Sequence, residues 1–91
     1  MENYQYLQPE TQKRYLWIKT LMEVFKLKAD EEYIELNNLL KAFGWVATGG
    51  EAKIRIDQGE VTVNGEVETR RRKKMRTGDT VLFEDMKGKV E

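Results

Sequence analysis

A dense run of positively charged side chains is the feature of this sequence with the clearest chemical use. The segment from Glu68 to Val81 reads ETRRRKKMRTGDTV, and six of the seven residues from Arg70 to Arg76 are basic. Arginine and lysine donate charge-assisted hydrogen bonds to phosphate and carboxylate oxygens. Six like charges repel one another, and a bound polyanion relieves that repulsion. The run therefore predicts a phosphate-contacting surface made by Arg70, Arg71, Arg72, Lys73, Lys74 and Arg76.

The alternative is a solvated charge run that keeps the edge of a sheet from pairing with other chains. The run is neither terminal nor rich in Gly and Ser, and alternating apolar residues flank it on both sides. We therefore expect a loop and strand edge pinned at both ends, with Met75 pointing inward. The whole chain has 16 basic and 16 acidic residues and no net charge. Because salt screens charge beyond about 8–10 Å, the local field of the run is what a phosphate would feel.

A second candidate region is the start of a predicted helix at residues 48–59. Thr48 and Glu51 have the spacing of a capping box, in which each side chain accepts a hydrogen bond from a free backbone N–H. Gly49 and Gly50 have no side chains to block an approach, so the first N–H groups of the helix could face a phosphate. The same glycines also suit a tight turn between two closely packed helices.

Basic residues continue along this helix. Ala52 and Ile56 are four residues apart and are expected to face the core, which leaves Lys53 exposed. Lys53 and Arg55 are candidate phosphate contacts, and Lys41 on the preceding helix is a peripheral one. Each of them is as easily explained as an ordinary surface charge.

The residues that are missing argue against an enzyme. The chain has no Cys and no His, and it also lacks Ser. The usual Ser/His and Cys/His nucleophile systems and thiolate zinc sites therefore cannot be assembled within the chain. Carboxylates, Lys, Tyr and Thr remain, but no pattern gathers them into a catalytic cleft. We expect no catalytic residue, no metal and no cofactor.

Targeting and membrane signals are also missing. The N-terminal residues MENYQYLQPETQKR do not form a basic region followed by an apolar run, so they are not typical of a secretory signal. No apolar stretch approaches the roughly 20 residues that cross a bilayer. The expected location is the cytoplasm, with no membrane partner.

Three helices are predicted in the first two thirds of the chain. Pro9 suits the first turn of a helix over residues 8–28, whose apolar residues recur at helical spacing. This helix could pack on the core, form a dimer face or contact a larger partner. After a polar junction at 28–35, a second helix ends at Gly44, and the third covers 48–59. Phe43 and Trp45 are expected in the core rather than as platforms for bases.

The pattern then changes to the two-residue period of strands. Val61 and Val63 alternate with polar residues and lead into Asn64-Gly65, a strong hairpin signal. The returning strand at 66–68 is expected to point Val67 inward. After the basic run, a strand at 78–84 has its inward residues at positions 81 and 83, and a turn at 87–88 is expected to fold the last residues back.

These elements together resemble the S4 RNA-binding domain family, and in particular its small stand-alone bacterial type. The resemblance covers roughly residues 33–86 and is most specific in TGGEAKIRIDQGEVTVNG (48–65) and TGDTV (77–81). The matching positions are Thr48, Ala52, Ile56, Gly59, Val61, Val63, Asn64 and Gly65. It implies an α+β fold, an S4-like (alpha-L) module of two short helices packed on a small, mainly antiparallel sheet, with an added N-terminal helix. The expected division is an extension at 1–32 and an RNA-binding domain at 33–91.

The resemblance also implies an RNA-binding module whose helix pair and hairpin form one basic face for structured RNA, often ribosomal RNA or a ribosomal particle. Many members have an Arg where this chain has Gly49 and a basic residue where it has Ile34 and Glu35. The basic run could replace those contacts. Because no exposed aromatic residue is evident, we expect recognition of phosphates and RNA shape. The rival hypothesis is a protein-interaction module that uses the apolar N-terminal helix, with the basic run as a solvated edge.

Overall fold

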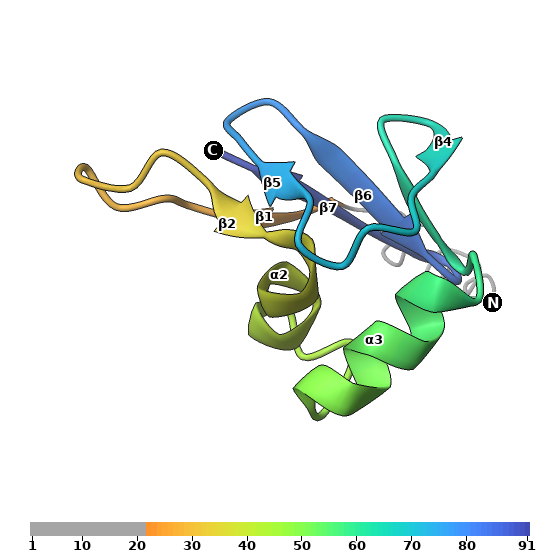
Figure 1. Ribbon diagram of the computed structural model, residues 1–91. Helices are drawn as coiled ribbons and strands as arrows, with labels where there is room; N and C mark the ends of the chain where they lie inside the picture. The colour runs from red at the N-terminus through yellow and green to blue at the C-terminus, as the bar shows by residue number, and fades with distance from the viewer. Residues whose placement is uncertain (1–21) are drawn as a thin grey trace, which may run out of the picture.

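The computed structural model describes residues 22–91, and Figure 1 shows two helices on one side of a twisted sheet. The five-stranded sheet has the order β1-β7-β6-β3-β4, and a separate two-stranded sheet joins β2 and β5. Only the β1–β7 pair is parallel, so the predicted mainly antiparallel sheet with two short helices is confirmed. The elements are β1 (Glu23–Phe25), β2 (Ile34–Glu35), α2 (Leu36–Ala42), α3 (Gly49–Asp57), β3 (Val61–Val63), β4 (Glu66–Val67), β5 (Lys74–Met75), β6 (Thr80–Phe83) and β7 (Met86–Val90).

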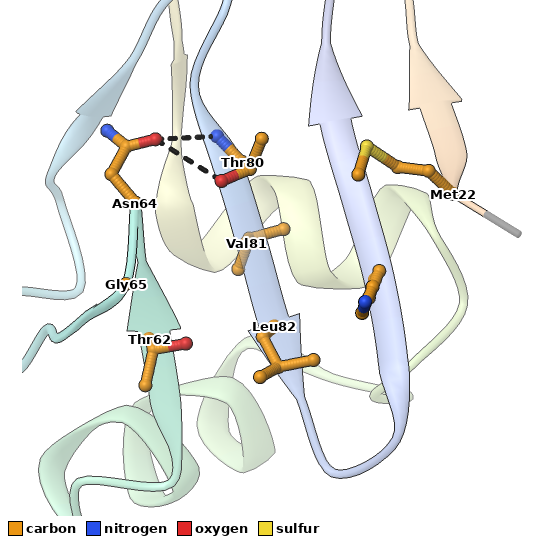
Figure 2. Close-up of a pocket in the computed structure, with 8 residues that line it drawn as sticks. Met22, Thr62, Asn64, Gly65, Thr80, Val81 and Leu82 are labelled. Atoms are coloured by element: carbon orange, nitrogen blue, oxygen red, sulfur yellow. Dashed lines mark hydrogen bonds between the residues drawn. The ribbon is translucent and has the colours of Figure 1, made fainter. Parts of the chain in front are cut away.

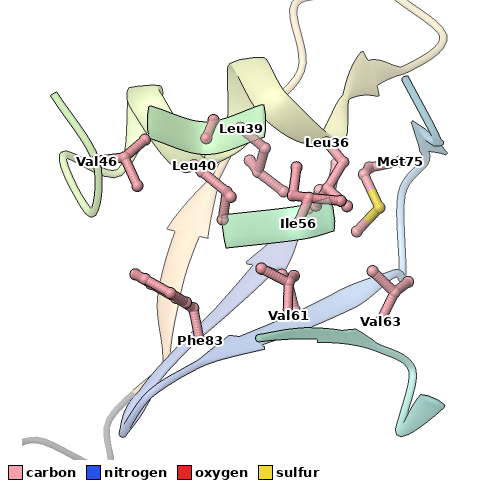
Figure 3. Close-up of a cluster of buried hydrophobic side chains, with 12 residues drawn as sticks. Leu36, Leu39, Leu40, Val46, Ile56, Val61, Val63, Met75 and Phe83 are labelled. Carbon is pink, nitrogen blue, oxygen red and sulfur yellow. The ribbon is translucent and has the colours of Figure 1, made fainter. Parts of the chain in front are cut away.

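The hydrophobic core lies between the helices and one face of the sheet (Figure 3). Helix α2 contributes three leucines and α3 contributes Ala52 and Ile56, all of them fully buried. They pack against the inward residues of β3, β6 and β7 and against Met75 of β5. The inward faces predicted for the two helices, for β3 and for β6 are therefore confirmed. Met75, in the middle of the basic run, is also fully buried, as predicted.

Local hydrogen bonds explain where α3 begins. The Thr48 hydroxyl accepts a hydrogen bond from the Glu51 N–H at 3.1 Å, and the Glu51 carboxylate accepts one from the Ala47 N–H at 2.9 Å. The predicted capping box is therefore present, although the carboxylate reaches the residue before the cap. Gly44 and Gly59 follow the two helices with φ angles of +77° and +78°, a conformation that other residues rarely adopt. The predicted ends of both helices are confirmed.

The helix predicted over residues 8–28 is wrong for its last part. Residues 23–25 form strand β1, which pairs with β7 from Glu23–Gly88 to Phe25–Val90. The Leu27 N–H donates to the Glu91 carbonyl at 2.7 Å, and the Glu91 N–H donates to the Phe25 carbonyl at 2.9 Å. The backbone groups that a helix would use are therefore satisfied by the distant C-terminal strand. The rest of that predicted helix lies outside the described residues.

Two details of the predicted strands are also wrong. The turn expected at 87–88 is at Glu84-Asp85, and Lys87 and Gly88 lie within β7. Val67 is 61% exposed because the two-residue turn pairs it with Thr62, which faces away from the helices. Side chains alternate between the two faces of a sheet, so the partner of an outward residue also points outward.

The boundary predicted between residues 32 and 33 stays a prediction. Strand β1 lies before it and still belongs to the same sheet as β7, so the sheet extends into the predicted N-terminal part. Within residues 22–91, neither helix has the length and apolar character needed to cross a bilayer.

Candidate nucleic-acid interface

The basic run is part of the folded domain and is fixed against the start of α2. Its residues Lys74 and Met75 form β5, which pairs antiparallel with β2. The Leu36 N–H donates to the Lys73 carbonyl and the Asn37 N–H donates to the Arg71 carbonyl, both at 2.9 Å. Free N–H groups in the first turn of α2 are thus satisfied by carbonyls of the basic run. The expectation of a loop and strand edge pinned at both ends is confirmed.

The side chains of the run line an open hollow of about 560 Å³. Every residue that lines it is basic: Arg70, Arg72, Lys73, Lys74 and Arg76. We call this surface the basic hollow. A concave surface of one sign concentrates the electrostatic field and raises the local concentration of counter-ions. The hollow therefore has the charge and shape expected of a polyanion site. Arg71 is exposed but does not line it.

A buried carboxylate holds the first arginine of the hollow. Glu68 is only 9% exposed, and it accepts hydrogen bonds from Arg70 Nε at 2.8 Å, Arg70 Nη2 at 3.0 Å and the Arg70 backbone N–H at 2.9 Å. These bonds from a cation lower the pKa of Glu68 to about 2. Arg70 thus has a fixed position, although its side chain remains 71% exposed. Glu68 has no distinguishing signal in the sequence, because its burial depends on how the loop folds.

The Glu68–Arg70 pair makes stability depend on pH. A carboxyl with a lowered pKa stabilises the fold above its unfolded value near 4.5, and this contribution is lost as the pH falls toward 2. Because Arg70 is exposed to water, we expect a contribution of about 1–2 kcal/mol. Glu68→Gln should lower the free energy of unfolding by that amount at pH 7. The difference from the wild type should shrink as the pH falls through 4.5 and should be small near pH 2, where Glu68 is half protonated in the folded protein.

Urea unfolding at several pH values measures this difference directly. Glu66→Gln is the matched control, because Glu66 lies two residues away and is exposed. Its effect should stay within about 0.5 kcal/mol at every pH. Equal stability of wild type and Glu68→Gln at pH 7 would contradict the assigned role of the pair.

The far end of the run is tied to the Asn64-Gly65 turn. Asp79 accepts from the Arg76 backbone N–H at 2.8 Å and from the Asn64 side-chain amide at 3.1 Å. The side-chain Oδ1 of Asn64 in turn accepts a hydrogen bond from the Thr80 N–H at 2.9 Å (Figure 2). The VNG and GDT sequences, although 15 residues apart, therefore form one network that fixes where the basic run ends. Asp79 is a second positioning residue that sequence analysis did not identify.

The residues predicted at the start of α3 have a different environment. The Thr48 hydroxyl is used in the helix cap, and Gly49 and Gly50 form the first turn. Lys53 is exposed, as expected. Lys41 lies beside this turn, since a Cβ atom at Gly49 would be 3.9 Å from its Nζ atom.

Arg55 is occupied by contacts within the protein. Its guanidinium pairs with Glu60 at 2.9 Å, and it lies 5.8 Å from the centre of the Phe83 ring. The hydrogen bond to Glu60 raises the pKa of Arg55. These contacts link the end of α3 to the sheet, so Arg55 has a structural role whether or not it touches a ligand.

The two candidate regions lie at opposite ends of α2 (Figure 1). Leu36 and Asn37 at its start contact the basic run, whereas Lys41 at its end lies beside the start of α3. At 1.5 Å per residue, the seven residues of α2 separate the regions by about 10 Å. A ligand that contacts both must therefore be larger than one phosphate group.

One aromatic residue accompanies the cations, although no exposed aromatic residue is evident in the sequence. Tyr33 is 37% exposed, and Lys74 and Arg76 of the basic hollow lie over its ring. Phe43 and Trp45, by contrast, stack on each other with ring centres 4.6 Å apart and pack against the core, as predicted. Tyr33 falls in a segment that the sequence marks only as a polar junction, so no periodic signal indicated it.

A second hollow, of about 240 Å³, lies on the face of the sheet away from the helices (Figure 2). It is lined by Met22, Thr62, Asn64, Gly65, Thr80, Val81, Leu82 and Lys87. Lys87 is its single charged residue among those the structure describes, so the hollow lacks the charge of an anion site. Among residues 22–91, no group of His, Cys, Asp and Glu side chains is placed to hold a metal ion.

Comparisons with known proteins agree with this geometry. The model of a protein family described as the S4 domain matches residues 25–91. The chain is 51% identical over 51 residues to YbcJ of Escherichia coli (strain K12), a protein provisionally named as RNA-binding; the match covers 56% of this chain and 73% of YbcJ. An uncharacterized YbcJ of Shigella flexneri matches to the same extent. The solution structure of the E. coli protein, described as revealing an alpha-L motif involved in RNA binding, aligns with a TM-score of 0.60 and 43% identity over 77% of this chain and 87% of that one.

Proposed function

Because this chain belongs to the S4 domain family, we propose that it is an RNA-binding protein whose basic hollow grips the phosphates of a structured RNA. The observation that carries the proposal is the hollow itself. Five basic side chains line one concave surface, and no acidic side chain of residues 22–91 lines it. Two carboxylates pair with lining residues from outside, Glu68 with Arg70 and Glu32 with Arg76. Backbone pairing of the run with β2 and α2 supports a surface formed before the ligand arrives. A preformed site loses less side-chain conformational entropy when it binds its ligand.

The proposed interface has a centre and a flank. Arg72, Lys74 and Arg76 contact phosphates at the centre, where Arg70 and Lys73 complete the hollow and Arg71 lies at its border. The flank, about 10 Å away along α2, consists of Lys53 with the backbone N–H groups of the turn at Thr48, Gly49 and Gly50. Arg55 supports the flank indirectly, because its contacts with Glu60 and Phe83 hold α3 against the sheet. A ligand that reaches both parts has phosphates spread over a surface, as a folded RNA does.

Phosphate contacts alone do not distinguish RNA from DNA. The preference for RNA rests on the family and on the E. coli relative, whose structure is described as containing an RNA-binding motif. Ribosomal RNA, free or in a ribosomal particle, is the target that we propose, and the cytoplasm is where the protein would meet it. No catalytic role is proposed.

A salt titration tests the proposal. Each phosphate neutralised on a nucleic acid contributes about −0.7 to −0.9 to the slope of log K against log salt. Four to six contacts should therefore give a slope of about −3 to −5 with a folded ribosomal RNA hairpin. The binding constant would be measured by fluorescence anisotropy at several salt concentrations.

Two competitors serve as controls. A DNA hairpin of the same sequence tests the preference for RNA, and polyglutamate tests whether any polyanion suffices. Equal affinity for polyglutamate would favour an acidic protein as the partner. A slope shallower than about −1 with RNA would contradict a phosphate-binding hollow.

A further inference from the structure

Tyr33 places an aromatic ring at the border of the basic hollow. Lys74 Nζ lies 5.0 Å from the centre of this ring, and the Arg76 guanidinium carbon lies 5.4 Å from it. Both cations line the hollow. Tyr33 directly precedes β2, whose Ile34 pairs with Met75 between the two cations. The strand pair therefore holds the ring and the two charges close together.

The surroundings of Tyr33 differ from those of Phe43 and Trp45, the aromatic residues near the helices. Phe43 and Trp45 pack on the core, and their rings lie against Gly88 of β7. Their faces are used for internal packing.

Tyr33 is 37% exposed, and Lys74 and Arg76 lie over its ring. Arg76 also pairs with the exposed carboxylate of Glu32 at 3.9 Å, and its side chain remains 53% exposed. When the phosphates of an unpaired nucleotide draw these two cations off the ring, the face that they cover becomes available to the base. The site then offers both groups that such a nucleotide needs, a surface for its base and charges for its phosphates.

We propose that Tyr33 stacks on an unpaired base of the bound RNA while Lys74 and Arg76 hold the flanking phosphates. This inference rests on the proposed function and specifies its ligand as a folded RNA with an unpaired nucleotide, such as a bulge. A base inside a continuous A-form duplex is already stacked on its neighbours and cannot reach a side chain. Only an unpaired base can be turned out onto the ring. The site thus distinguishes an interrupted helix from a perfect one.

The test compares two RNA probes. One is a continuous duplex, and the other is the same duplex with a single unpaired 2-aminopurine. Stacking on an aromatic side chain supports a gain of about tenfold in affinity, so the wild type should bind the bulged probe about tenfold more tightly. The 2-aminopurine fluorescence should change on binding, because it responds to stacking.

Two substitutions at position 33 separate stacking from packing. Tyr33→Leu retains apolar bulk but removes the aromatic face, so it should lose the preference for the bulged probe and the fluorescence change. Its affinity for the continuous duplex and the salt slope should stay as in the wild type. Tyr33→Phe retains the face and should keep the preference. Circular dichroism checks that both variants are folded.

The outcomes distinguish this inference from the proposed function. If the wild type binds both probes equally with a steep salt slope, the stacking inference is overturned and the phosphate site stands. An equal loss on both probes in Tyr33→Leu would instead make Tyr33 a positioning residue for Lys74 and Arg76, which also overturns stacking. If the wild type binds neither probe at low salt, the proposed function itself fails.

Discussion

Affinity for a folded RNA should fall by about 100-fold or more at ~0.1 M salt when Arg72, Lys74 and Arg76 are replaced together by Glu. All three side chains line the basic hollow, so the variant removes three proposed phosphate contacts and adds three repulsive charges. The slope of log K against log salt should become shallower by about 2–3. Fluorescence anisotropy with the same RNA hairpin measures both quantities.

Arg70 is left unchanged in this variant for a structural reason. Its guanidinium satisfies the buried Glu68 carboxylate, and removing it would leave that charge without a partner. Loss of a charged partner in a buried pair is destabilising, and reduced folding would then imitate reduced binding. The three chosen side chains are exposed, and the carboxylate that Arg76 pairs with, Glu32, is exposed as well, so their replacement should disturb stability less.

Three lysines outside the basic hollow provide a control with the same change in net charge. Lys87 and Lys89 alternate in β7 with the inward residues Gly88 and Val90, and Lys26 follows β1 at the same edge of the sheet. Replacing Lys26, Lys87 and Lys89 by Glu should cost less than about tenfold in affinity, because these charges are outside the hollow. A loss equal to that of the first variant would show that net charge, and not the hollow, controls binding.

Gly88→Ala should lower the free energy of unfolding by about 1–3 kcal/mol. A Cβ atom at this position would collide with Phe43 Cε2 and would be 2.6 Å from Phe43 Cζ and 3.0 Å from the Trp45 ring. The two stacked rings would have to move away from β7. In a domain of this size, such a loss lowers the melting temperature by roughly 5–20 °C. Thermal unfolding followed by circular dichroism measures it.

Gly50→Ala is the matched control for this substitution. Gly50 lies in the first turn of α3, and the atom nearest to an added Cβ would be Thr48 Oγ1 at an ordinary 3.8 Å. Because Ala favours a helix over Gly, the variant should be equally stable or more stable by up to about 1 kcal/mol. Similar destabilisation by both substitutions would argue against close packing at Gly88.

The elements that sequence analysis predicted correctly depend on neighbours in the chain. The capping pair Thr48 and Glu51, the glycines that end both helices and the Asn64-Gly65 turn act within a few residues of themselves. The inward residues of α2, α3, β3 and β6 follow from a period of 3.6 or 2. The basic run is likewise visible as a run, and local charge density is enough to suggest phosphate as its ligand.

What the tertiary structure decided depends on pairing between distant segments. Residues 23–25 form a strand only because β7, more than 60 residues later, satisfies their backbone groups, and local helix preference could not show this. The pairing of β2 with β5 likewise brings Tyr33 beside Lys74 and Arg76 across about 40 residues of chain. Within the basic run, the fold also brings Arg76 to 3.9 Å from the carboxylate of Glu32, more than 40 residues earlier, whereas Arg70 pairs with the nearby Glu68. The sequence alone determined that a dense positive charge is present and roughly where it lies. Only the fold decided which of those charges share one concave surface, because that surface is built from contacts that no local pattern records.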